Sequence, residues 1–82
     1  MAKTDKIKKT VLSGVSDASV RFADLCYLLE ALDFRRRRGK GSHVIFTKAG
    51  VIEIINLQPR KDGKAKPYQV KQVRTIINNY SL

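Results

Sequence analysis

The only histidine of this 82-residue chain, His43, lies in the sequence Gly41-Ser42-His43 and is the first candidate for chemistry. Histidine ordinarily exchanges a proton near neutral pH, so general acid or base chemistry is what it would supply. Gly39 and Gly41 precede it and would let a ligand approach the backbone closely. A lone histidine on a strand is nevertheless more often structural than catalytic. No serine, cysteine or acidic residue has a spacing typical of a catalytic triad or a metal site.

Basic side chains form two clusters that flank this histidine in the sequence. They are Arg35–Arg38 with Lys40 and, directly before a predicted helix, Arg60, Lys61, Lys64 and Lys66. The chain has 17 Lys and Arg against 7 Asp and Glu, which gives a net charge of +10. This excess predicts a polyanionic partner, and two clusters favour nucleic acid over a merely solvated surface. An acidic protein would also be attracted, and the arginine run alone is compatible with a guarded edge strand.

Size and composition limit the class of protein. A chain of 82 residues allows one small domain with a modest core, and 43% hydrophobic residues argue against full disorder. The single cysteine, Cys26, excludes an internal disulfide and a zinc site built from several thiolates, and its apolar neighbours predict a buried, inert thiol. No stretch has the pattern of a signal peptide or a membrane span, so we expect a cytoplasmic protein that needs no cofactor or membrane.

Two amphipathic helices are predicted on either side of this candidate region. The first is expected over Ser19–Leu32 with Ser19 as its N-cap, and its apolar stripe comprises Phe22, Leu25, Leu28, Leu29 and Leu32. The second is expected to begin at Pro67, because proline suits the first helical turn. Its apolar stripe comprises Val70, Val73, Ile76, Ile77 and Tyr80. We expect four polar residues to lie largely away from that stripe: Gln69, Lys71, Gln72 and Arg74.

Three short strands are predicted between the helices. They are Phe34–Lys40, His43–Lys48 and Val51–Leu57, with a tight turn at Lys48-Ala49-Gly50 between the last two. Alternation along the second strand places Val44 and Phe46 on one face and His43 with Ile45 on the other. If the helices cover Val44 and Phe46, His43 lies on the open face. Two helices on one side of a three-stranded antiparallel sheet make a two-layer α+β domain in the order α-β-β-β-α.

Residues 1–18 are predicted to form a basic N-terminal extension, and residues 19–82 the compact domain. Within the extension, Thr4 is expected to cap a short helix that carries Ile7, Val11 and Leu12 and ends at Gly14. Because its lysines make such a helix weak on its own, two alternatives stay equally open: a solvated arm or a docked helix.

The sequence Gly41-Ser42-His43-Val44-Ile45-Phe46 matches a family motif, a Gly-Ser-His-x-x-aromatic strand. The leucine-rich first helix ending at Asp33-Phe34 and the sequence Lys66–Val70 at the last helix support the match. The chain thus resembles, over roughly residues 20–82, the HicA toxins, small messenger-RNA interferases of bacterial type II toxin–antitoxin pairs. The resemblance implies a fold like the double-stranded-RNA-binding domain, His43 as the catalytic residue, RNA as the substrate and a HicB-type antitoxin as the inhibitor.

The expected activity is that of an endoribonuclease in which His43 transfers a proton and the substrate's own 2′-hydroxyl is the nucleophile. The expected RNA-binding residues are Arg36, Arg38, Lys40, Gly41, Ser42, Lys64 and Lys66. No metal is expected, because only Glu53 and Asp62 are left as acidic partners near His43. A second proton carrier is open among Tyr68, a lysine and water. The alternatives are a non-catalytic RNA-binding module of the same fold and a basic subunit for an acidic protein; no oligomeric state is predicted.

Overall fold

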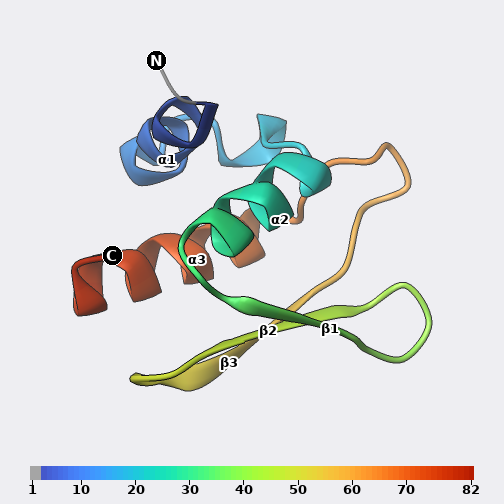
Figure 1. The fold of residues 1–82 in the computed structure, drawn as a ribbon. Helices are drawn as coiled ribbons and strands as arrows, with labels where there is room; N and C mark the ends of the chain where they lie inside the picture. Colours follow the sequence, from blue (N-terminus) through green and yellow to red (C-terminus); the bar gives the residue numbers. More distant parts are fainter. Residues whose placement is uncertain (1–2) are drawn as a thin grey trace.

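The computed structural model describes residues 3–82, which form three helices and one sheet. The elements are α1 (Lys3–Ser13), a 3₁₀ turn (Asp17–Ser19), α2 (Phe22–Ala31), β1 (Arg35–Arg38), β2 (Val44–Lys48), β3 (Val51–Leu57) and α3 (Pro67–Tyr80). The strands pair antiparallel in the order β1-β2-β3. All three helices lie on one face of the sheet (Figure 1). The predicted α+β fold in the order α-β-β-β-α is therefore confirmed, with α1 as an additional helix before it.

The core lies between the sheet and the two central helices. Phe46 of β2 is fully buried, and its register partner Ile55 on β3 is buried beside it. They pack in one apolar cluster with residues of α2 and α3, among them Leu25, Leu28, Leu29, Val70, Val73, Ile76 and Ile77. Val44 is half-buried and packs against the same cluster. The face of β2 that carries Val44 and Phe46 therefore points to the helices, as the alternation predicts.

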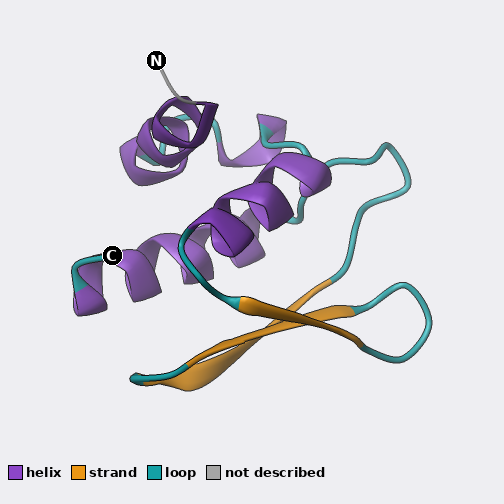
Figure 2. Cartoon of the chain, in the orientation of Figure 1, coloured by secondary structure: helices purple, strands orange, loops and turns teal. Residues whose placement is uncertain are grey.

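Two of the predicted boundaries near the candidate site are corrected. Helix α2 begins at Phe22 because the chain first makes the 3₁₀ turn and then extends at Arg21, which is the N-cap residue. Ser19 is therefore not the N-cap, and no side chain caps this helix. Strand β1 is shorter than expected because the chain turns after Arg38, and loops and turns join the short strands (Figure 2). The turn at Ala49-Gly50 and the strand Val51–Leu57 are confirmed.

Helix α1 is docked rather than solvated. Its Val11 is fully buried, and the helix contacts α2 and α3 on the side away from the sheet (Figure 1). The Arg74 guanidinium donates to both carboxylate oxygens of Asp17, at 2.8 and 3.1 Å, and to the carbonyl oxygen of Val11 at 3.1 Å. Arg74 lies outside the apolar cluster, but it joins α3 to the segment after α1, a contact that the sequence does not predict. Thr4 lies inside the helix and not at its cap.

A second residue of α3, Gln69, was predicted to lie away from the apolar stripe, but this prediction is wrong because its side chain is buried at 4% exposure. Its Nε2 donates to the carbonyl oxygen of Asn56 at 3.3 Å, and its Oε1 accepts the backbone N–H of Gln58 at 3.2 Å. A buried amide is tolerated when both of its ends are hydrogen-bonded. At the other end of α3, the Tyr80 hydroxyl accepts the backbone N–H of Ile52 at 3.3 Å. Side chains of α3 therefore bond the backbone of β3 at two places.

Candidate active site

The imidazole of His43 is held by a neighbour on β3, the strand that pairs with β2. His43 Nδ1 lies 2.9 Å from Oδ1 of Asn56, within hydrogen-bonding distance. Asn56 is exposed and pairs in register with Ile45, between the inward-facing Ile55 and Leu57. Because side chains alternate along a strand, Asn56 lies on the face of the sheet away from the helices. His43 bonds to it there, so the expected position of His43 on the open face is confirmed.

The turn between β1 and β2 presents His43, and it depends on glycine. The N–H of Gly39 donates to the carbonyl oxygen of His43 at 2.9 Å, and the N–H of His43 donates to that of Lys40 at 3.1 Å. A Cβ added at Gly39 would lie 3.0 Å from the Cβ of His43 and 3.1 Å from its carbonyl oxygen. Gly41 has a φ of +63°, a left-handed conformation that suits glycine, and open space beside it. The absence of a side chain at Gly39 therefore makes room for His43. Beside Gly41 the turn is open to solvent or a ligand.

A shallow hollow of about 300 Å³ lies beside this turn. It is lined by Arg36, Arg38, Gly41, Ser42, His43 and Val44. Arg36 and Arg38 pair in register with the inward-facing Phe46 and Val44, whereas Arg35 and Arg37 alternate to the open face, where His43 contacts Asn56. The hollow therefore brings together side chains from both faces at the end of the sheet. The guanidinium of Arg36 also donates to Glu30 of α2 at 3.1 Å. Five of the expected site residues are thus brought together around one hollow.

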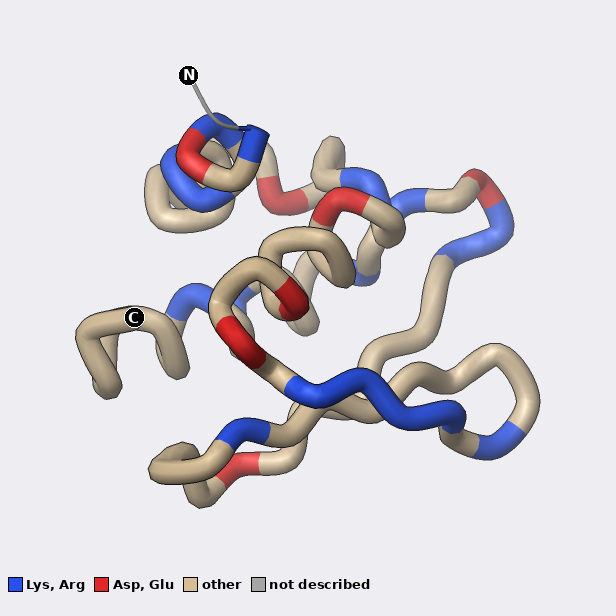
Figure 3. Tube along the Cα trace, viewed as in Figure 1, with Lys and Arg blue, Asp and Glu red and all other residues tan. Residues whose placement is uncertain are grey.

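The expected lysines divide into those that contact this region and those that do not. Lys66 Nζ donates to Gln58 Oε1 at 3.0 Å, and Gln58 Nε2 donates to Ser42 Oγ at 3.4 Å. Gln58 therefore links Lys66 to the turn. Lys64 pairs through its backbone with Arg21, in the segment before α2, and does not line the hollow. Lys40 is exposed within the turn, and Figure 3 shows the basic residues of β1 and of the loop before α3 as separate segments.

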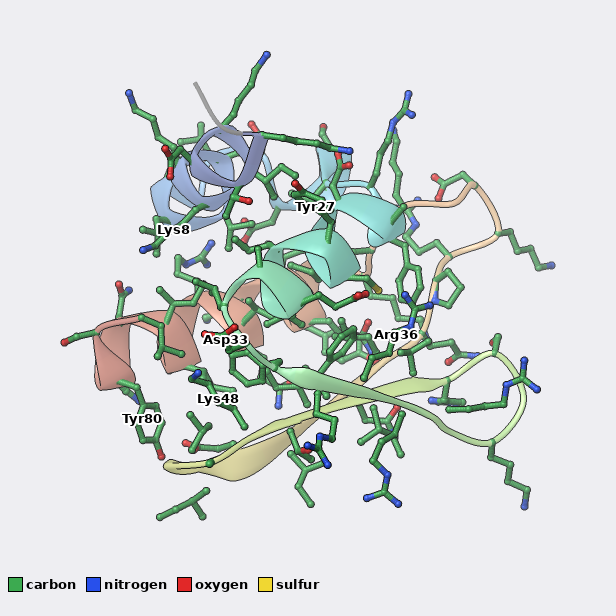
Figure 4. The ribbon with its side chains drawn as sticks, viewed as in Figure 1. Lys8, Tyr27, Asp33, Arg36, Lys48 and Tyr80 are labelled. Atoms are coloured by element: carbon green, nitrogen blue, oxygen red, sulfur yellow. The ribbon has the colours of Figure 1, made fainter. Side chains whose placement is uncertain are left out.

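The acidic residues considered as metal partners of His43 are engaged elsewhere. Glu53 accepts a hydrogen bond of 2.6 Å from the hydroxyl of Tyr80, at the end of α3 (Figure 4). This bond raises the pKa of Tyr80 above its ordinary value. Asp62 pairs with Arg60 at 3.2 Å and accepts the backbone N–H of Lys64 at 3.1 Å. Within residues 3–82, no three His, Cys, Asp or Glu side chains gather in the manner of a metal site.

Cys26 has no part in the site. It is 3% exposed in the core, and burial raises the pKa of its thiol to about 11. The predicted buried thiol is confirmed, and its protonated state makes it a poor nucleophile.

Two polar residues of the site are missed by the sequence analysis. The face of Asn56 could have been predicted from alternation, because it stands between apolar residues that face inward. It therefore shares the face of Ile45. What alternation does not give is the register that sets it beside His43. Gln58 lies in a polar loop after β3, and its sequence context has no comparable signal.

The comparisons with known proteins add a family to this geometry. A family model described as HicA toxin of bacterial toxin–antitoxin matches residues 22–78, which is more than half of the chain. Searches of the curated proteins and of the solved structures gave no match. Among the helices described in residues 3–82, none has the length and apolar character to cross a membrane. The matched segment runs from the first residue of α2 almost to the end of α3, so the sheet, the His43 turn and the hollow all lie inside it. This chain therefore belongs to the HicA family of bacterial toxin–antitoxin toxins.

Proposed function

We propose that this HicA-family toxin is an endoribonuclease that cleaves messenger RNA through proton transfer by His43. The observation that carries the proposal is the placement of the only imidazole of the chain beside a hollow lined by two arginines. The hydrogen bond from Nδ1 to Asn56 leaves the other ring nitrogen, Nε2, available for a proton. A base beside cationic donors is what attack on a phosphodiester requires.

The proposed reaction uses a nucleophile that the substrate already carries. His43 Nε2 takes the proton of the ribose 2′-hydroxyl while that oxygen forms a bond to the adjacent phosphorus and the bond from phosphorus to the 5′-oxygen breaks. The products are a 2′,3′-cyclic phosphate and a 5′-hydroxyl, once the leaving 5′-oxygen takes a proton from a second group. Lys66 is our candidate for that group, because Gln58 ties it to Ser42 in the turn that carries His43.

The RNA backbone is proposed to bind along the basic surface on both sides of the hollow. Arg36 and Arg38 line it, and each guanidinium can contact phosphate with more than one N–H group. Gly41 and Ser42 offer backbone and hydroxyl groups in the same turn. The other proposed phosphate contacts are Lys40, Lys64 and Lys66. Lys64 does not line the hollow, so we propose that it contacts an RNA phosphate farther from the cleavage position.

We propose that the reaction needs no divalent metal. Glu53 is engaged by Tyr80, and Asp62 is engaged by Arg60, so neither is directed at His43 by its hydrogen bonds. The hollow itself is lined by two arginines, whose charge disfavours a cation. The positive side chains supply the stabilisation of phosphorane charge that a metal ion would otherwise give.

Membership of a toxin–antitoxin family implies an antitoxin partner. We propose that this partner is of the HicB type, and that it inhibits by covering His43 and the arginine-lined hollow. The net charge of +10 favours an acidic surface on the inhibitor, which would speed the encounter. Since messenger RNA is the proposed substrate, we propose the cytoplasm as the compartment in which the toxin acts.

The test combines a modified substrate with a chelator. We expect the pure protein to cut a labelled RNA in excess EDTA, and to lose the cut at a position where deoxyribose replaces ribose. His43→Ala protein purified in parallel controls for contaminating ribonuclease. Loss of activity on chelation with recovery in magnesium would contradict the mechanism. Binding of RNA without any cleavage would contradict the enzymatic function and favour an RNA-binding module.

A further inference from the structure

The contact between His43 and Asn56 decides which nitrogen of the imidazole carries the proton. A neutral imidazole has one N–H donor and one lone-pair acceptor, and its partner selects between the two forms. The amide oxygen Oδ1 of Asn56 can only accept, so the 2.9 Å contact places the hydrogen on Nδ1 of His43. The lone pair is then on Nε2.

We infer that Asn56 is a positioning residue, which holds His43 as the Nδ1–H tautomer so that Nε2 is the base. The inference rests on the proposed function for the reaction that it serves, but not for the contact itself. In the Nε2–H form, the lone pair would be on Nδ1 and would face Asn56 instead of the substrate. Asn56 therefore keeps the imidazole in the form that can accept a proton from RNA.

The backbone of Asn56 is fixed by the core and by a side chain of α3. Its neighbours Ile55 and Leu57 are fully buried in the core. Its carbonyl oxygen accepts from Gln69, whose other end holds the N–H of Gln58. Among residues 3–82, Gln69 is the buried polar side chain, and both of its hydrogen bonds serve the segment that carries Asn56. The two hydrogen bonds offset the free-energy cost of burying the Gln69 amide, and they also keep the backbone of Asn56 in place.

The backbone beneath His43 is fixed independently. It exchanges hydrogen bonds with Gly39 and Lys40 within the turn, and the close approach to Gly39 leaves little room for a shift. The imidazole is then free to rotate about its two side-chain torsions, and the bond to Asn56 selects one orientation. The β2–β3 pairing brings these two backbones together, 13 residues apart in sequence, and the side-chain contact with Asn56 then sets the orientation of the ring.

An amide suits this position better than a carboxylate would. Aspartate at residue 56 would accept the same hydrogen bond, but it would add a negative charge beside the proposed path of the RNA phosphates. Asparagine orients the ring without that repulsion. The choice of side chain is thus consistent with a polyanionic substrate.

The direct test reads the tautomer of His43 by ¹⁵N NMR of the imidazole. The chain has one histidine, so the ring signals need no assignment. In the neutral ring, we expect the Nδ1–H form to dominate in the native protein. Asn56→Ala should shift the population toward the Nε2–H form that free histidine prefers. Asn79→Ala, which removes an exposed amide near the end of α3, is the matched control and should leave the spectrum unchanged.

Kinetics on labelled RNA supply the second measurement. Asn56→Ala should lower kcat by about ten- to a hundredfold with little change in KM, which is part of the about 10²–10⁴-fold that a positioned base contributes. Asn56→Asp should restore kcat toward the native value while raising KM, since it keeps the acceptor and adds a charge. A purely structural role for Asn56 would predict no such rescue and no separation of kcat from KM.

The outcomes separate this inference from the proposed function. Identical tautomer populations in the native protein and Asn56→Ala would overturn the positioning role, as would a native kcat in Asn56→Ala. If Asn56→Ala shifts the tautomer but the native protein cuts no RNA, the role of Asn56 is supported and the nuclease function is overturned. A shift of tautomer together with the loss of kcat supports both.

Discussion

Arg74 and Arg36 each donate to a carboxylate on another element, but their surroundings differ. The Arg74–Asp17 pair joins α3 to the segment after α1, and its side chains are 19% and 21% exposed. The Arg36–Glu30 pair joins β1 to α2, and its side chains are 51% and 49% exposed. The hydrogen bond to Asp17 raises the pKa of Arg74 further above its ordinary value, whereas Arg36 borders the hollow beside His43.

This difference separates a structural role from a functional one. An exposed ion pair contributes little to stability, because water and salt compete for both partners. Arg36 could therefore exchange Glu30 for a phosphate of the proposed RNA substrate at small cost. A shielded pair with several hydrogen bonds leaves unsatisfied groups when one partner is removed, so Arg74 is committed to holding the fold. The packed helices thus supply stability, while the outer end of the sheet carries the proposed active site.

The largest expected effect comes from His43→Ala, which alters only the functional region. We expect cleavage to fall by about 10²–10⁴-fold, because general base catalysis is lost. The free energy of unfolding should change by no more than about 0.5 kcal/mol, since the side chain lies on the open face of the sheet. Cleavage assays and thermal melts measure the two quantities. A large fall in the melting temperature would show that His43 is structural. It would also contradict the division between a structural and a functional region.

Arg74→Ala alters only the structural region. It should lower the free energy of unfolding by about 2–3 kcal/mol, because Asp17 and the Val11 carbonyl lose their partner in a partly buried place. Urea titration gives the value. Arg36→Ala is the matched control, with the same change of residue in an exposed pair, and should cost no more than about 1 kcal/mol. Equal losses in the two variants would erase the distinction between the pairs.

Within the functional region, the two faces of β1 can be compared directly. The double variant Arg36→Glu with Arg38→Glu should weaken RNA binding about tenfold or more, and the salt dependence should become shallower by roughly one unit for each lost phosphate contact. Arg35→Glu with Arg37→Glu changes the net charge equally at two residues that do not line the hollow. Affinity measured across a salt series should fall less in this second pair. Equal falls would mean that net charge alone, and not the hollow, attracts the RNA.

The smallest expected effect is a pH dependence that arises in the core. The unfolded Cys26 thiol ionises near its ordinary pKa of 9.0, and the folded thiol near about 11. Below both values the thiol is protonated in either state, so its contribution is constant. As pH rises between them the unfolded state gains by losing its proton, and stability falls by about 1 kcal/mol at a pH of about 10.

Unfolding of native protein and Cys26→Ala at a pH of about 8 and about 10 isolates this contribution. The loss between the two pH values should be smaller in Cys26→Ala, because the ionising group is absent. The same loss in both proteins would assign the pH dependence to other groups.

The elements that follow an apolar pattern were predictable from the sequence. The strand Val51–Leu57 and the start of α3 at Pro67 agree with the structure, and alternation around Phe46 set the face of His43. Gln69 was missed because a polar side chain is expected outside, and only the backbone of β3 gives its amide a reason to be buried. The pair of His43 and Asn56 was missed for another reason. Their contact depends on the register of β2 and β3, which is irregular between Phe46 and Lys48 and which alternation does not determine.

The bonds that α3 makes to β3 have a consequence for self-association. An edge strand with unpaired backbone groups can recruit a strand from another molecule and start an aggregate. Here Tyr80 occupies the N–H of Ile52, and Gln69 occupies groups of Asn56 and Gln58, so one edge of the sheet is blocked at both ends. The opposite edge is β1, where four successive arginines repel another copy. Neither edge is therefore a good template for the addition of a strand from another copy.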